Sequence, residues 1–201
     1  MQEVAQSPLA AWENFYIIVG SSAGALTGLQ FVVITLVMES RMGANPTTIG
    51  AFATPTIVHF CMALLVSAVL SAPWPALFWA GFVVAACGVV GLLYSVLIVW
   101  RAMHQTGYKM VAEDWTWHVV FPLASYVALA VGGVLLVQYS LISLFAIAGA
   151  TLLLVYIGIH NAWDTTTYVA AQAKKPTEGN ATAPASEPAT AATAPSATAG
   201  S

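Results

Sequence analysis

The chain has 201 residues, of which 59% are hydrophobic and only 6% are charged, and its formal net charge is −3. Soluble domains usually carry about 25% charged residues, so this composition excludes a soluble globular protein and indicates an integral membrane protein. The lipid bilayer is therefore the expected partner, and a bacterial inner (plasma) membrane is the predicted location. No nucleic-acid partner is expected.

Five apolar stretches are long enough to cross a bilayer, because a spanning helix needs roughly 20 mostly apolar residues. They predict an all-α, polytopic transmembrane bundle over residues 1–172, with spans at about 14–38, 50–72, 76–100, 118–139 and 141–163. Pro73-Trp74-Pro75 joins the second and third spans and predicts a tight antiparallel hairpin. An alternative with four spans treats 118–163 as one block with a re-entrant turn. Residues 173–201 contain no large apolar side chain and predict a disordered, Ala/Thr/Pro-rich tail.

The basic residues all follow odd-numbered spans. They are Arg41 after the first span, Arg101 and Lys109 after the third, and Lys174 and Lys175 after the fifth. Loops rich in Lys and Arg lie in the cytoplasm. The sequence therefore predicts that the N-terminus is outside, that the C-terminus is inside, and that the tail is cytoplasmic.

Glycines recur at every fourth position in the first span, at Gly20, Gly24 and Gly28. On a helix these positions form one stripe, and small-residue stripes let membrane helices approach closely. We expect this helix to be the spine against which the others pack, although glycine is also simply common in membrane helices. Similar stripes occur in later spans and could instead bind a second copy or another membrane protein: Gly81 and Ala85; Ala124, Ala128 and Gly132; Ala146 and Ala150.

A first group of polar residues is predicted within the membrane. Folding the first two spans about residue 44 brings Gln30 level with His59, and Thr54 and Thr56 flank Pro55 one turn before that histidine. Proline frees a backbone carbonyl that nearby threonines can satisfy. Gln30, Thr54, Thr56 and His59 are therefore the expected members of an intramembrane polar cluster. The alternative is that neutral His59 makes one interhelical hydrogen bond that only sets the register.

A second polar group is predicted near the cytoplasmic end. Folding the last two spans about residue 140 brings His118 level with the turn that holds His160, Asn161 and Asp164. His160 and Asp164 are four residues apart and so share one helical face. A carboxylate beside an imidazole stabilises the protonated ring. The alternative is a polar cap at the membrane surface.

Ionisable groups inside a membrane are costly and indicate function. The favoured interpretation is a small transport, channel or accessory membrane protein whose protonatable cluster opens to the cytoplasm. A non-catalytic scaffold or assembly partner is the alternative. A haem- or metal-binding redox protein is a third interpretation, because His118 and His160 lie at similar depth on facing helices. No cofactor and no metal site are predicted. The chain has no GxSxG, HExxH, P-loop or dinucleotide-binding fingerprint, so an enzyme is not expected.

Overall fold

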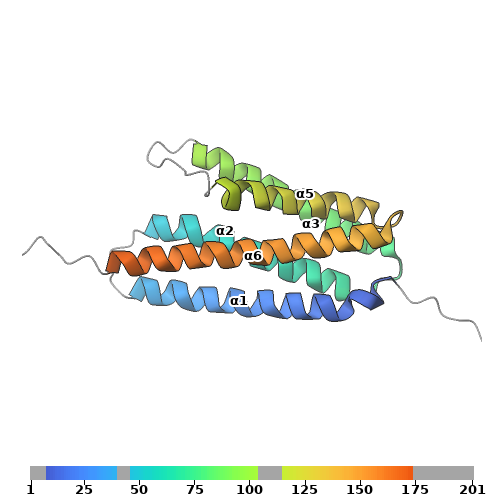
Figure 1. The fold of residues 1–201 in the computed structure, drawn as a ribbon, viewed down its shortest axis with the longest axis horizontal. Helices are drawn as coiled ribbons and strands as arrows, with labels where there is room; N and C mark the ends of the chain where they lie inside the picture. The colour runs from blue at the N-terminus through green and yellow to red at the C-terminus, as the bar shows by residue number, and fades with distance from the viewer. Residues whose placement is uncertain (1–7, 40–45, 104–114, 174–201) are drawn as a thin grey trace, which may run out of the picture.

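A computed structural model describes residues 8–39, 46–103 and 115–173, with side chains for 8–36, 54–100 and 115–167 (Figure 1). These residues are all-helical, and no strand occurs among them. The helices are η1 (Ala10–Trp12), α1 (Glu13–Glu39), α2 (Pro46–Ser71), α3 (Leu77–Met103), η2 (Thr116–Val120), α5 (Phe121–Leu135) and α6 (Ser140–Ala173). Apart from Ala173, the last residue of α6, the predicted tail lies outside the described residues.

Five of the helical segments are long and apolar enough to cross a membrane: Ala10–Leu36, Thr54–Ser71, Leu77–Trp100, Thr116–Leu135 and Ser140–Thr167. They correspond to the five predicted spans. The block 118–163 is divided at residues 136–139 by a turn in which the Tyr139 N–H donates to the Leu135 carbonyl at 2.9 Å. The protein therefore has the helices of an integral membrane protein.

The helix at the centre of the bundle is α6. It packs against α5, α2 and, over a smaller area, α1, while α1 packs mainly on α2, and α3 packs mainly on α5 (Figure 1). The expectation that the first helix is the spine is wrong. Of the five membrane-length helices, α1 has the least buried apolar segment and α6 the most. The reason is that α1 presents large apolar side chains such as Ile18, Leu29 and Phe31 to the outside of the bundle.

Glycine explains why α3 pairs with α5. A Cβ on Gly81 would lie 2.6 Å from the Gly133 carbonyl oxygen, and a Cβ on Gly88 would collide with the backbone of Ala130. The two helix backbones can therefore approach only because these positions have no side chain. The chain does reverse at the turn after α2, as predicted, but the close packing of α3 is with α5 rather than with α2.

The depth register between neighbouring helices agrees with the register predicted from the loops. A Cβ on Gly20 would lie 2.9 Å from Ser67 Cβ, and one on Gly24 would lie 3.8 Å from Leu64 Cδ1. Both pairs are symmetric about residues 43–44. Between α5 and α6, a Cβ on Gly132 would lie 2.9 Å from Ile147 Cγ1, which is symmetric about residues 139–140.

Candidate functional site: a buried histidine–tyrosine pair and its polar neighbours

The most buried ionisable contact in the described residues joins α2 to α5. His59 Nδ1 lies 2.8 Å from the Tyr126 hydroxyl oxygen, and the two groups share a hydrogen bond. His59 is 3% exposed and Tyr126 is fully buried. A hydrogen bond in such surroundings is shielded from competing water, so it holds α2 and α5 at one relative position.

Tyr126 reaches His59 because α3 has a glycine behind it. A Cβ on Gly91 would overlap the Tyr126 ring, so the ring lies directly against the α3 backbone. Tyr126 is one turn from Ala130 on α5, and Ala130 packs on Gly88, which is on α3 like Gly91. The glycine face of α3 therefore positions the phenol as well as the two helices.

His118 lies in the widened turn η2 that precedes α5. The Phe121 N–H donates to the carbonyl of Thr116, five residues earlier, which is the hydrogen bond of a π-helix. Pro122 follows, and proline has no N–H to donate to the carbonyl four residues before it. The backbone therefore forms a single π-turn before Pro122, and such turns occur often at functional sites. The His118 side chain is half-buried at this turn.

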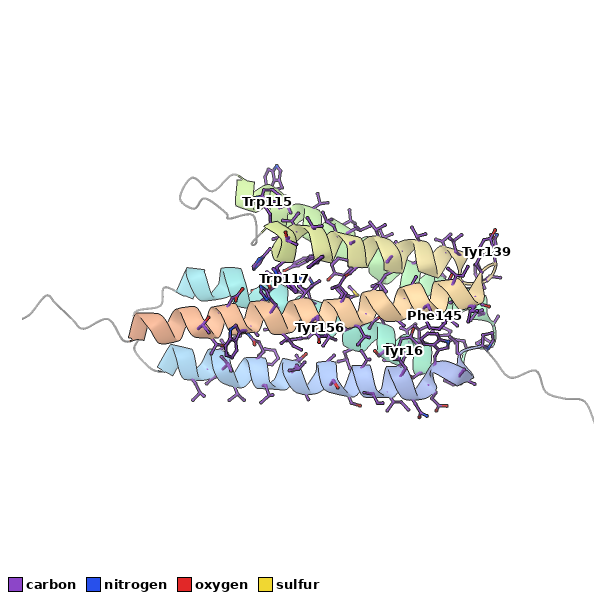
Figure 2. The ribbon with its side chains drawn as sticks, viewed as in Figure 1. Tyr16, Trp115, Trp117, Tyr139, Phe145 and Tyr156 are labelled. Atoms are coloured by element: carbon purple, nitrogen blue, oxygen red, sulfur yellow. The ribbon has the colours of Figure 1, made fainter. Side chains whose placement is uncertain are left out.

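His160 and Asp164 form the part of the cluster nearest the surface. His160 Nε2 lies 3.1 Å from Asp164 Oδ2, and the two side chains are 26% and 51% exposed. The indole of Trp117, which lies on η2 (Figure 2), stacks on the His160 imidazole with ring centroids 3.9 Å apart and an interplanar angle of 16°. This contact ties the start of the fourth span to α6 beside His118.

The four members of the first predicted cluster have different surroundings. Gln30, Thr56 and His59 are buried, whereas Thr54 is exposed. The partner that His59 contacts, Tyr126, was not singled out by the sequence analysis. A hydroxyl at mid-depth of the fourth span was the available signal, since polar groups there need partners.

The second predicted cluster is brought together in part. His160 contacts Asp164, and Asn161 is buried with 3% exposure. His118 is half-buried on η2, next to Trp117, whose ring stacks on His160. Trp117, whose ring covers His160, was missed because tryptophan at a membrane boundary is usually an anchor.

The predicted packing glycines also differ from one another. Gly20 and Gly24 face α2, whereas a Cβ on Gly28 would have no neighbour within 4 Å. The stripe is therefore in contact with α2 over its first half and faces outward at its end.

The described part of the chain contains no group of three or more His, Cys, Asp or Glu side chains placed to hold a metal ion. No family model, curated protein or solved structure matches the chain. The case for a function therefore depends on the site itself.

Proposed function

We propose that this protein is a small membrane transport or channel component that moves protons between the cytoplasm and a buried His59–Tyr126 pair. The observation that carries the proposal is the 2.8 Å contact between these two side chains inside a bundle of membrane-length helices. Ionisable side chains within a membrane are rare and usually mark ion pathways or proton relays.

The polar side chains become less exposed from the His160–Asp164 end of the bundle toward that pair. Asp164 is half exposed, His160 is about a quarter exposed, His118 is intermediate, and His59 is buried. An imidazole can take a proton on one ring nitrogen and release one from the other. This order suits a path on which a proton enters at the His160–Asp164 end and is passed inward to His59.

Two buried hydroxyls support a continuation of the path toward the opposite end of the bundle. Ser67 Oγ and Tyr16 Oη are buried, and neither has a hydrogen-bond partner among the described residues. Ser67 is eight residues after His59 on α2, which is about 12 Å along the helix axis. A conducting path through the outer half would use these hydroxyls together with bound water.

We further propose that the His160–Asp164 end faces the cytoplasm of a bacterial cell and that the N-terminus is outside. Helix α1 begins and α6 ends at opposite ends of the bundle (Figure 1), and the basic residues all follow the first, third and fifth predicted spans in the sequence. The test uses a chain with Cys61→Ala and Cys87→Ala that carries either Ser140→Cys or Thr167→Cys. A membrane-impermeant maleimide added to intact cells is expected to label the first variant and not the second. The reverse pattern would overturn the orientation.

The transport proposal is tested with purified protein in lipid vesicles that contain a pH-sensitive dye. A potassium gradient with valinomycin supplies the driving voltage. Vesicles with wild-type protein are expected to change their luminal pH faster than empty vesicles, in the direction in which the voltage drives protons. The double variant His59→Gln/Asp164→Asn and the single variant Tyr126→Phe are expected to lose this flux. Ser125→Ala is the matched control, because the Ser125 hydroxyl bonds the Phe121 carbonyl of its own helix at 2.9 Å.

Absence of flux in the wild type, or equal flux in all variants, would refute proton transport. A stoichiometric membrane protein that co-purifies with a chain inactive in this assay would favour the assembly role instead. A Soret band in the purified protein would favour the haem interpretation.

A further inference from the structure

Asn161 is a buried amide whose carbonyl oxygen has no partner in the described part of the chain. The residue is 3% exposed, and Oδ1 accepts no hydrogen bond there. The large majority of buried side-chain polar atoms in folded proteins are hydrogen-bonded to protein or to ordered water. A carbonyl oxygen in this position therefore requires a donor that the described residues do not supply.

The helical positions around Asn161 define the direction in which it points. Gly158 faces α2, because a Cβ there would collide with the Phe60 ring, and His160 faces η2, because Trp117 stacks on it. Successive residues of an α-helix are rotated by about 100°. Asn161 therefore lies between these two directions and faces the space between α2 and η2.

The depth of Asn161 matches that of the two nearest histidines. The Gly158–Phe60 contact sets Asn161 level with residue 57 of α2, because α2 and α6 are antiparallel. His59 is two residues further along, which is about 3 Å. Asn161 and His59 therefore lie on facing elements at nearly the same level.

The same comparison can be made across α5 and α6. The contact between Gly132 and Ile147 sets Asn161 level with His118. Asn161, His118 and His59 thus approach one level of the bundle from α6, η2 and α2.

We propose that a water molecule is bound at Asn161 Oδ1 and connects this amide to the His59 imidazole. When the Tyr126 hydroxyl donates to Nδ1, the ring proton of His59 is on Nε2 and can be donated to the water oxygen. The water donates one hydrogen to Asn161 Oδ1 and keeps the other for a further acceptor. A neutral guest is favoured over a metal cation, because a charge in this low-dielectric region is costly and the nearby carboxylate, Asp164, is already paired with His160.

This site deepens the proposed function, since the water joins the two polar groups along the proton path. Asn161 is then a positioning residue for the water. Only the role of the water in proton transfer rests on the proposed function, because the binding of the water can be measured whether or not the protein transports protons.

The test is water-edited solid-state NMR on the full chain in lipid bilayers, with ¹⁵N-labelled histidine and asparagine. In the wild type, the His59 ring nitrogens and the Asn161 side-chain amide are expected to receive polarisation from water as early as the partly exposed His160 ring. In Asn161→Leu, which keeps the branching and the number of non-hydrogen atoms of the side chain but removes the acceptor, the His59 ring is expected to lose this early transfer. Thr151→Val is the matched control on α6, because the buried Thr151 hydroxyl already bonds the Ile147 carbonyl at 2.7 Å.

Several results would overturn the site. The first is absence of early transfer to Asn161 and His59 in the wild type, and the second is unchanged transfer to His59 in Asn161→Leu. The third is loss of the early transfer when NaCl is added but not when choline chloride is added, which would indicate that sodium ions occupy the site. The wild-type measurement alone decides the matter if Asn161→Leu fails to fold. Early transfer without proton flux would refute transport and leave the water site, whereas flux without early transfer would refute the site.

Discussion

Removal of one hydroxyl from the buried pair is the sharpest test of the site. Tyr126→Phe keeps the ring that packs on Gly91 but leaves His59 Nδ1 without its partner at 2.8 Å. Hydrogen bonds between membrane helices average about 0.6 kcal/mol in double-mutant cycles and reach about 1.7 kcal/mol. Leaving a buried partner unsatisfied costs about 1–3 kcal/mol.

Because the pair is buried, we expect the free energy of its hydrogen bond to lie near the upper end of the range for membrane helices, about 1.7 kcal/mol. His59 is 3% exposed and Tyr126 is fully buried, so bulk water does not reach the Nδ1 side of the ring to replace the missing hydroxyl. We expect Tyr126→Phe to lower the free energy of unfolding by about 1.5 kcal/mol, which is roughly a tenfold change in the unfolding equilibrium. A cycle with His59→Leu is expected to give a coupling energy of about 1–1.7 kcal/mol.

The measurement is reversible unfolding in mixed micelles, in which the mole fraction of sodium dodecyl sulfate is increased and helix content is followed by circular dichroism. Ser125→Ala is the control and is expected to change the free energy of unfolding by no more than about 0.5 kcal/mol, because its hydroxyl bonds only its own helix. A coupling energy indistinguishable from zero between His59 and Tyr126 would refute the reasoning, whatever the size of the single-variant effects.

Three further variants test the neighbours of the pair. Gly91→Leu is expected to displace the Tyr126 ring and to lower the free energy of unfolding by about 1–3 kcal/mol, as in an overpacked core. In this background the double-mutant cycle between His59 and Tyr126 should show no coupling, and retained coupling would contradict the packing of the ring on Gly91. Asp164→Asn removes a half-exposed partner of His160, so stability should change by less than about 0.5 kcal/mol while proton flux falls; a large loss of stability would show a structural pair. Trp117→Ala removes the stacked indole and should cost about 0.5–1.5 kcal/mol or more; no change in unfolding would contradict the contact.

Much of the helix layout was predictable from sequence because it depends on local properties. The length and hydropathy of each apolar stretch indicate five membrane-length helices, and short connections bring residues at equal distance from a turn to equal depth. The pairing of Gly20 with Ser67 and of Gly132 with Ile147 follows that rule. The depth of His59 within the second span could be anticipated for the same reason.

The choice of neighbours and the direction of each side chain were decided only by tertiary structure. In lipid the hydrophobic effect does not select one helix face over another, so close fit and polar contacts determine which faces meet. The glycines of α3 fit α5, and this contact, rather than the short turn after α2, brings Tyr126 to His59. The same rotation of α6 that packs Gly158 on Phe60 turns Asn161 toward the histidines. A sequence specifies the depth of such residues, whereas the rotation of each helix about its axis follows from packing among all five.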